Sequence, residues 1–213
     1  MWKKNFDRIY LVNLPSRPDR LEQAKIELDR FNISFTLVPA IKLDRGAEGL
    51  YMTMQALFEH AEKENFGNIL VLEDDVQFSM ELTSEKMNNI LAELPKDYHL
   101  LYLGGNAYRS FEKVEDCKHI FKANYLLSSH AVAYSKEGRR LILEEMRKSL
   151  GKKMSAFEPL DMMYVRAIQS LGKSYISNPL LAFQRPGFSD IEKRETDYTS
   201  LIQGRFKEQL SKL

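Results

Sequence analysis

The chain has 213 residues, of which 44% are hydrophobic and 29% charged, and its formal net charge is +1. This length suits a single domain with a proper core, and the balanced charge argues against nucleic acid as a partner, because phosphate binding needs a basic excess. The single cysteine, Cys117, excludes an intrachain disulfide and a multi-cysteine metal site. No stretch approaches the ~20 apolar residues that span a bilayer, and the run 9–12 is too short for a signal peptide core, so we expect a cytoplasmic protein.

Short apolar runs alternate with helical patterns along most of the chain. Strands are predicted at 9–14, 34–39, 69–72, 99–103 and 131–134, with partly extended chain over 175–183. Helices are predicted at about 18–31, 50–61, 87–94, 135–146 and 159–171, the first of them capped by Ser16 with Pro18 in its first turn. This alternation predicts an α/β fold in which helices flank a mostly parallel sheet.

Three stretches depart from this alternation. Residues 42–49 are charged and contain two glycines, which predicts a loop, and residues 104–122 are polar and mixed, which predicts an irregular insert. Over 192–213 the chain is rich in charge, with four apolar residues at helical spacing: Leu201, Ile202, Phe206 and Leu210. We expect this C-terminal helical appendage to dock on the body of a single domain spanning 1–213. Peripheral contact with the inner-membrane surface stays open, because Lys207 and Lys212 accompany the apolar residues.

The most informative stretch is 69–75, where four apolar residues run directly into Glu73, Asp74 and Asp75. Such a run fits a strand buried on both faces, and ligands of open α/β sheets bind beyond the carboxyl ends of their strands. Three adjacent acids repel one another unless a cation lies among them, and their oxygens suit Mg²⁺ or Mn²⁺, which complete their shells with substrate phosphates. We therefore predict a metal–diphosphate site at Glu73 and Asp75. A solvated loop whose acids cap the next helix stays open as the alternative.

Five short segments spread over residues 9–191 follow one another in a specific order. They are Ile9–Leu14 with Arg17, Asp19 and Arg20, then Val71–Val76, Ser129–Ser135, Glu158–Asp161 and Phe188–Ile191. In this order they resemble glycosyltransferase family 25, the bacterial lipooligosaccharide galactosyltransferase-like enzymes that are related to animal collagen galactosyltransferases. The resemblance implies an A-type glycosyltransferase (GT-A) fold, a UDP-sugar donor, usually UDP-galactose or a relative, and Mn²⁺ or Mg²⁺ as cofactor. It implies a glycan or lipid-linked oligosaccharide, such as lipooligosaccharide, as acceptor.

The chain departs from the family pattern ahead of the acidic strand. The family usually has Gly-Cys-x-x-Ser-His there, whereas this chain has Gly49-Leu50-Tyr51-Met52-Thr53-Met54. Thr53 can replace a serine hydroxyl, but Met54 cannot donate or carry a proton as histidine does. A degenerate member that binds a nucleotide sugar without turning it over therefore stays open beside an active enzyme.

A nucleotide-sugar transferase must grip its donor, and the loop after the first strand is the natural place. We predict that Asn13, Arg17 and Arg20 line the donor site, with an arginine reaching phosphate or ribose. Glu73 and Asp74 are expected to assist Asp75 at the diphosphate. A turn role for Asn13 and a solvated helix face for the arginines are the alternatives.

Two later segments supply further candidates for donor contact. His130 precedes a predicted strand and faces either the donor or the metal, or else is a satisfied structural histidine. Gln184, Arg185, Ser189 and Asp190 flank a Pro-Gly pair, which makes this segment a turn. We expect the turn to close over the diphosphate as a lid.

The acceptor hydroxyl needs a base in an inverting mechanism, and Asp161 is our candidate. It lies near the start of a predicted helix, where the helix N-terminus stabilises an ionised carboxylate. The alternative is that this charge serves the helix alone, and Glu158 is the second candidate base. Tyr51 and Tyr108 are candidates for contact with a sugar.

Three other protein classes bear on the acidic strand. A haloacid-dehalogenase-like phosphatase needs Asp-x-Asp, but this chain has Glu73 at the first position. A sugar nucleotidyltransferase is expected to carry a glycine-rich phosphate loop, and the turn 15–18 has no glycine. A non-catalytic nucleotide-sugar binder remains as the alternative of a different class.

Overall fold

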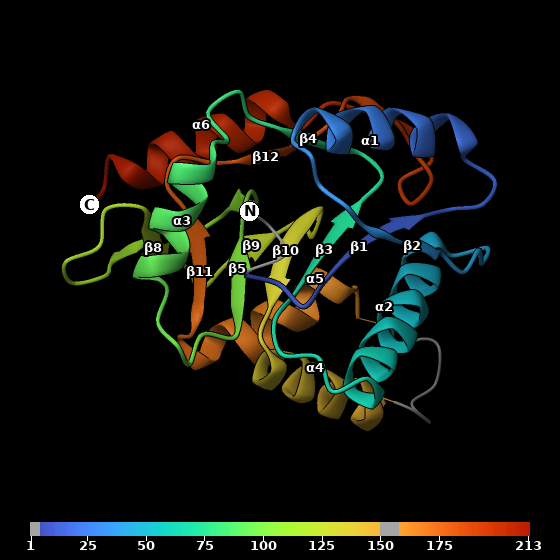
Figure 1. Ribbon diagram of the computed structural model, residues 1–213, viewed down its shortest axis with the longest axis horizontal. Helices are drawn as coiled ribbons and strands as arrows, with labels where there is room; N and C mark the ends of the chain where they lie inside the picture. Colours follow the sequence, from blue (N-terminus) through green and yellow to red (C-terminus); the bar gives the residue numbers. More distant parts are fainter. Residues whose placement is uncertain (1–4, 150–157) are drawn as a thin grey trace.

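The computed structural model describes residues 5–149 and 158–213 and contains one large α/β sheet (Figure 1). The strands in chain order are β1 (Arg8–Asn13), β2 (Thr36–Pro39), β3 (Ile69–Glu73), β4 (Val76–Phe78), β5 (Leu100–Tyr102), β6 (Asn106–Ala107), β7 (Glu112–Lys113), β8 (Ile120–Lys122), β9 (Leu126–Leu127), β10 (Ala131–Tyr134), β11 (Ser174–Ser177), β12 (Ala182–Gln184), β13 (Gly187–Ser189) and β14 (Arg194–Thr196). Eight of them form the main sheet in the order β2-β1-β3-β10-β5-β11-β8-β7. The acidic strand β3 therefore lies near the middle of the sheet.

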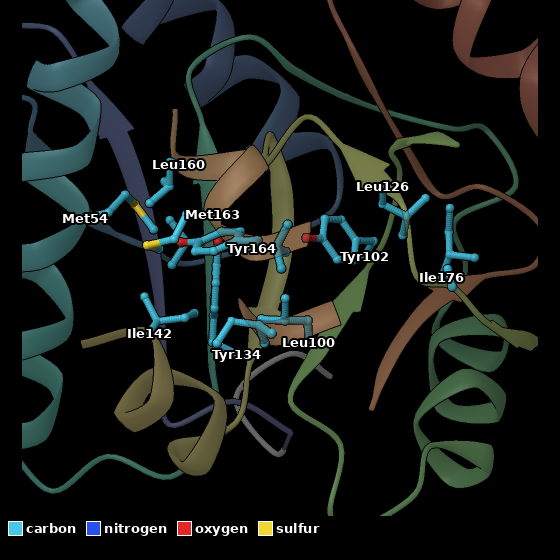
Figure 2. Close-up of a cluster of buried hydrophobic side chains, with 14 of the residues drawn as sticks. Met54, Leu100, Tyr102, Leu126, Tyr134, Ile142, Leu160, Met163, Tyr164 and Ile176 are labelled. Carbon is cyan, nitrogen blue, oxygen red and sulfur yellow. The ribbon is translucent and has the colours of Figure 1, made fainter. Parts of the chain in front are cut away.

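Helices cover both faces of this sheet. They are α1 (Pro18–Arg30), α2 (Gly46–Lys63), α3 (Ser84–Glu93), α4 (Lys136–Ser149), α5 (Leu160–Met163) and α6 (Thr199–Leu210). Successive strand residues point to opposite faces, so Leu11 packs in the cluster that holds α1 and α3, while Tyr10 packs in the cluster that holds α2, α4 and α5. Figure 2 shows part of the second cluster, with Met54 of α2 close to Met163 of α5. The predicted α/β fold with flanking helices is confirmed.

The sheet is mixed but mostly parallel, as predicted: six of its eight strands run in one direction, and β10 and β8 run against them. β1 pairs with β2 and β3 in parallel, and β11 pairs with β5 in parallel. β10 lies antiparallel between β3 and β5, and β8 is antiparallel to both β11 and β7. The chain reverses after β5 through the short β6 and β9 pair instead of a crossover helix, and a reversal of this kind produces antiparallel neighbours.

The region 104–122 is more ordered than its composition predicts. It contains β6, β7 and β8, of which the last two extend the main sheet. The ring of Phe111 stacks on that of Phe121 with a centroid distance of 5.8 Å and an interplanar angle of 2°. These strands have two or three residues each, which is too short to produce a periodic pattern in the sequence.

Two helix boundaries differ from the prediction. Arg17, not Ser16, precedes the first turn of α1, and no side chain caps it. Pro18 begins the helix as expected, because its missing N–H has no partner to lose there. α2 begins at Gly46, inside the predicted loop 42–49. The predicted helix 159–171 is continuous but irregular: α5 leads into a π-helix (Tyr164–Ile168) and a 3-10 turn (Gln169–Leu171), which Gly172 ends at a φ of +72°.

The C-terminal helix α6 docks on the body of the protein, as predicted. Ile202 and Phe206 are buried and belong to the same apolar cluster as Tyr10. Leu201 and Leu210 were also expected to pack on the body, but Leu201 is exposed and Leu210 is only partly buried. Within residues 5–149 and 158–213, none of the helices combines the length and apolarity that crossing a bilayer demands.

Candidate functional site

A cavity of about 370 Å³ opens beyond the carboxyl ends of β1, β2 and β3. Its floor contains Asn13, which ends β1, and the acids Glu73, Asp74 and Asp75, which follow the apolar part of β3. The walls come from residues 40–50, 106–108, 127–129, 159–161 and 189–201. Parallel neighbours such as β1 and β3 end at the same edge of a sheet, which explains why side chains 60 residues apart in the sequence meet here.

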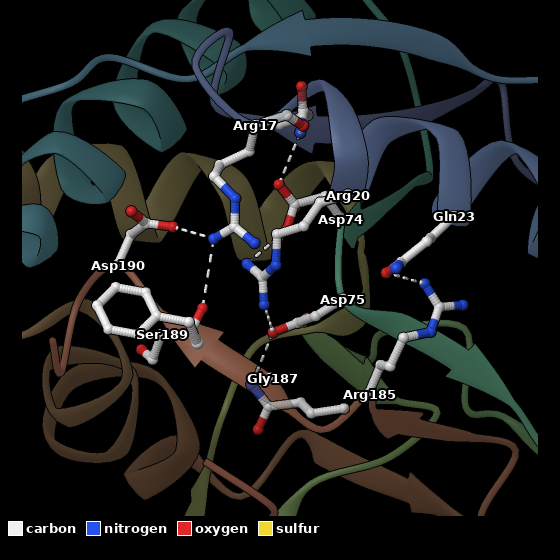
Figure 3. A network of polar contacts seen from close by, with 12 residues as sticks. Arg17, Arg20, Gln23, Asp74, Asp75, Arg185, Gly187, Ser189 and Asp190 are labelled. Carbon is white, nitrogen blue, oxygen red and sulfur yellow. Dashed lines mark hydrogen bonds and ion pairs between the residues drawn. The ribbon is translucent and has the colours of Figure 1, made fainter. Parts of the chain in front are cut away.

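Asp74 is held entirely by protein groups. Asn13 Nδ2 donates to Asp74 Oδ2 at 2.8 Å, and Arg20 Nη1 donates to Asp74 Oδ1 at 2.8 Å (Figure 3). Both carboxylate oxygens therefore already have a donor. Asp74 positions Asn13 and Arg20 at the cavity floor. Both of its oxygens are occupied by these two residues, so neither is left for a ligand.

Asp75 is held on one side only. Arg20 Nη2 lies 3.3 Å from Asp75 Oδ2, and Gln184 Nε2 lies 3.5 Å from the same oxygen. Asp75 Oδ1 is buried without a hydrogen-bond partner among the described residues, and so is Gln184 Oε1. Burial raises the pKa of Asp75, an effect that Arg20 partly offsets. Two buried oxygen acceptors at one edge of the cavity are thus left for a ligand.

Glu73 completes the acidic cluster on the other side. Its Oε1 accepts a hydrogen bond from Ser129 Oγ at 2.7 Å. Burial and the charge of Asp75 raise the pKa of Glu73 to about 8, so this carboxyl holds a proton at neutral pH unless a cation replaces it. The sequence analysis assigned no role of its own to Ser129. This residue was only the first of the segment Ser129–Ser135, which resembles family 25. The neighbouring Ser128 has a φ of +71° at the turn that leads to it.

Arg17 and the C-terminal hairpin meet above the cavity edge. Arg17 Nη1 pairs with Asp190 Oδ2 at 2.5 Å and donates to the carbonyl of Phe188 at 3.3 Å. Asp190 and Ser189 line the main cavity, whereas Arg17 lines a second, smaller cavity of about 270 Å³. Ser189 Oγ accepts a hydrogen bond from the N–H of Glu192, which stabilises the hairpin turn. Arg17 therefore ties the hairpin β13–β14 to the start of α1 and does not face the main cavity, contrary to the prediction.

The segment 184–185 lies against Asp75. The backbone N–H of Arg185 donates to the carbonyl of Asp75 at 2.6 Å, and its guanidinium donates to Gln23 Oε1 at 3.1 Å. Gln184 lines the main cavity, while Arg185 lines the second one, which shares Arg20 and Asp75 with the first. The turn after β12 thus covers one side of the acidic cluster.

Of the two candidate bases, the structure brings only Asp161 to the cavity. Asp161 lines it at the start of α5, where Oδ1 accepts a hydrogen bond from the N–H of Met162 at 2.9 Å. Glu158 does not line the cavity, because Arg166 holds its carboxylate through three hydrogen bonds of 2.8 to 3.1 Å. Glu158 thus faces Arg166 in this geometry, and its role as the second candidate base stays a prediction.

His130 belongs to the core. Its side chain is fully buried, it does not line the cavity, and a Cβ at Gly104 would come within 2.9 Å of its Nε2. Burial lowers the pKa of His130 to about 4, so the ring is neutral at physiological pH. The expected contact with the donor or the metal is not seen in this geometry, and the buried ring fits the alternative of a structural histidine.

The departure at Thr53 and Met54 lies away from the cavity. Thr53 Oγ1 donates to the carbonyl of Gly49 at 2.7 Å and accepts from the N–H of Ile41 at 2.8 Å, while Met54 is buried in the core. Ile41 lines the cavity, so Thr53 fixes a wall without touching its interior. Tyr51 is likewise half-buried in α2 and does not line the cavity.

The carboxylates of Glu73 and Asp75 are the groups that would hold a divalent cation, with a bound ligand completing its shell. Among residues 5–149 and 158–213, no group of three or more His, Cys, Asp or Glu side chains is arranged to hold a metal ion. Glu73 and Asp75 offer two carboxylates, and Asp75 Oδ1 has no protein partner. This donor set fits Mg²⁺ or Mn²⁺, which bind through one or two carboxylates and complete their shells with substrate phosphates.

Comparison with known proteins points to one family. No protein-family model matches the chain. The chain is similar to procollagen galactosyltransferase 1-B of Xenopus laevis, with 24% identity over 216 residues that cover 85% of this chain and 35% of the relative. It is also similar to probable inactive glycosyltransferase 25 family member 3 of Bos taurus, with 26% identity over 175 residues that cover 66% of this chain and 29% of the relative. The resemblance to family 25 is confirmed, at low identity over most of the chain.

The chain spans about a third of the length of the curated relatives that it matches. Among solved structures, a glycosyltransferase involved in the glycosylation of the major capsid of PBCV-1 is similar over 79% of both chains, with 12% identity and a TM-score of 0.49. A UDP-glucose pyrophosphorylase complexed with UDP-glucose is similar over 94% of this chain and 81% of that chain, with 11% identity and the same TM-score.

Proposed function

We propose that this chain, a relative of glycosyltransferase family 25, transfers a hexose from a UDP-sugar to a hydroxyl group of a glycan acceptor. One observation carries the proposal: Glu73 and Asp75 lie on the floor of a cavity at the carboxyl end of β3, and an oxygen of Asp75 has no hydrogen-bond partner in the described part of the chain. A site for a metal-bound diphosphate needs such an oxygen next to a positive side chain, and Arg20 supplies that charge at 3.3 Å from Asp75.

The nucleoside end of the donor belongs on the β1 and β2 side of the acids. Asn13 and the wall that Thr53 holds at Ile41 line this part of the cavity. The hairpin residues Ser189 and Asp190 face the same space. In this arrangement the hairpin covers the bound nucleotide, and the Arg17–Asp190 ion pair keeps it in place.

Glu73 and Asp75 would hold the cation, with Gln184 Oε1 beside them as a further oxygen. When bound, Mg²⁺ or Mn²⁺ supplies Lewis-acid neutralisation of the charge that develops on the leaving diphosphate. Arg20 adds a fixed positive charge to the same site, and Asn13 and Asp74 orient Arg20 through the hydrogen bonds described above.

Asp161 would act as the base. The acceptor oxygen forms a bond to the anomeric carbon, the bond from that carbon to the diphosphate oxygen breaks, and UDP leaves with the electron pair. The hydroxyl proton passes to the carboxylate of Asp161, which lines the cavity. This displacement inverts the anomeric configuration.

A nucleotide-sugar binder without turnover is the second candidate function. Two observations favour it: Met54 replaces the histidine of the family pattern, and one relative is named as a probable inactive family member. Against it, Met54 is buried in the core and does not line the cavity, so the replacement leaves the cavity's own side chains unchanged.

A melting-temperature screen separates these functions from no nucleotide binding at all. We expect UDP with Mn²⁺ to stabilise the protein by several degrees, because a ligand that binds only the folded state raises its stability. Asp75→Asn should abolish the Mn²⁺-dependent part of the shift. Release of UDP from UDP-galactose or UDP-glucose then distinguishes an enzyme from a binder. If UDP and Mn²⁺ leave the melting temperature unchanged, the proposed function is wrong.

A further inference from the structure

The order of the strands in the sheet determines which lining residues lie next to one another along the sheet edge. On one side of β3 lie β1 and β2, with Asn13 and the wall at Ile41. On the other side lie β10 and β5, and the segments that follow β5 and precede β10 carry Asn106, Tyr108 and Ser129. The cavity therefore has two ends, with the acids between them. In the proposed function, the nucleoside of the donor occupies only the end beside β1 and β2.

Tyr108 is the most conspicuous side chain at the second end. It lines the cavity and is 45% exposed. The guanidinium carbon of Arg205 lies 3.8 Å from its ring centroid, and the ring of Tyr125 lies 5.6 Å away at an angle of 53°. One face of the ring is thus covered by a cation and the ring is held in place, while much of its surface stays open.

Arg205 holds a second cavity residue as well. Its Nη1 donates to Asn106 Oδ1 at 2.9 Å, and Asn106 is buried at the start of β6. Arg205 comes from α6, which packs against β6 and is anchored in the core by Ile202 and Phe206. Figure 1 shows α6 running along one edge of the molecule. The C-terminal helix therefore positions an aromatic ring and an amide at the same end of the cavity.

We propose that this end of the cavity binds the sugar ring of the acceptor, with Tyr108 as its stacking platform and Arg205 as a positioning residue. The inference rests on the proposed function, which requires an acceptor within reach of Glu73, Asp75 and Asp161. An aromatic face suits the apolar C–H face of a sugar, and the amide of Asn106 and the carboxylate of Asp161 suit its hydroxyl groups.

The charges at this end favour a neutral sugar over an anionic one. Arg205 is already occupied by the Tyr108 ring and by Asn106. Asp161 lines the cavity and Arg205 does not, so no excess of positive charge faces the interior here. We commit to a neutral terminal sugar as the acceptor group, and a polypeptide hydroxyl group is the competing outcome of the test.

The test measures binding of fluorescently labelled protein to an array of neutral and acidic glycans and to peptides that carry serine, threonine or hydroxylysine, with UDP and Mn²⁺ present. The parent protein should bind at least one class of neutral terminal sugar. Tyr108→Ala and Arg205→Ala should each weaken that binding at least tenfold, whereas Tyr108→Phe, which keeps the ring, should restore it. Arg109→Ala is the matched control, because Arg109 stacks on Tyr125 but does not line the cavity.

The outcomes separate this inference from the proposed function. Binding to peptides alone, binding to no glycan, or glycan binding that Tyr108→Ala leaves intact would each overturn the acceptor site. Loss of folding is excluded by requiring each variant to keep the parent's melting temperature within 3 °C and its stabilisation by UDP. If the parent gains no stability from UDP but still binds glycans through Tyr108, the proposed function fails and the sugar site stands.

Discussion

Arg20 and Asp74 form a buried ion pair, with Nη1 of the arginine 2.8 Å from Oδ1 of the aspartate. Only 16% and 8% of their side chains are exposed. The same guanidinium lies 3.3 Å from Asp75, so one residue from the first turns of α1 offsets two of the three consecutive acids at the end of β3. The acidic cluster therefore depends on a cation that the fold itself provides.

Replacing Arg20 should destabilise the protein through these acids. Arg20→Ala leaves Asp74 buried with only Asn13 as partner, and we expect the free energy of unfolding to fall by about 2–4 kcal/mol. Urea denaturation of parent and variant measures the loss. Arg140→Ala is the control, since its pairs with Glu137 and Glu144 are about half exposed and solvent screens them, so this variant should change stability far less. Equal effects of the two variants would contradict the role given to Arg20.

Neutralising Asp161 should reduce transfer without affecting donor binding. We expect Asp161→Asn to lower turnover by ~10²–10⁴-fold, because a positioned base typically contributes that much. Stabilisation by UDP with Mn²⁺ should stay at the parent level. Glu158→Gln is the matched control: the ion pair with Arg166 keeps Glu158 out of the cavity, so turnover should stay close to that of the parent. A larger loss for Glu158→Gln than for Asp161→Asn would reverse the assignment.

Thr53 should affect nucleotide binding from outside the cavity. Thr53→Val keeps the shape of the side chain but leaves the N–H of Ile41 without its acceptor, which should cost about 1–2 kcal/mol of stability. The wall at Ile41 would then loosen, and we expect the UDP dissociation constant, measured by calorimetry, to rise several-fold. Thr36→Val in the exposed part of β2 serves as the control and should change neither quantity appreciably. Unchanged UDP affinity in Thr53→Val would show that this wall does not contact the nucleotide.

His130 should make the protein sensitive to acid. Its pKa of about 4 in the folded protein lies below the ordinary value of 6.5, so below pH 6.5 the unfolded chain binds a proton that the folded protein does not. Stability is therefore lost as the pH falls, by about 1.5 kcal/mol from this group between pH 6.5 and pH 5. His130→Gln removes the titration, and its free energy of unfolding should fall less steeply over this range. Identical pH profiles for parent and variant would mean that His130 does not titrate as its burial requires.

The acidic strand, the α/β class and the docked C-terminal helix could all be predicted because each depends on local pattern. Residues 69–75 contain an apolar run that ends in three acids, and Ile202 and Phe206 lie at helical spacing. β7 and β8 could not be predicted, because strands of two or three residues are stabilised by their neighbours in the sheet and leave no period in the sequence.

The candidate site divides in the same way. Sequence position and the family resemblance together indicated Asn13, Glu73, Asp75 and Asp161 as candidate site residues, since residues that follow strands or begin helices lie at the edges of an α/β layer. They ranked Asp161 before Glu158 but could not show which of the two faces the cavity, because an ion pair between Glu158 and Arg166 decides that.

By itself, the sequence determined that an apolar strand ends in three acids and that strands and helices alternate around it. Only the tertiary structure decided what each acid does. Asp74 is satisfied by Asn13 and Arg20, whereas Asp75 keeps a buried oxygen that no group of residues 5–149 and 158–213 bonds. The physical reason is that hydrogen-bond satisfaction and burial depend on groups brought together across the sheet, and identical carboxylates side by side in the chain carry no record of those partners.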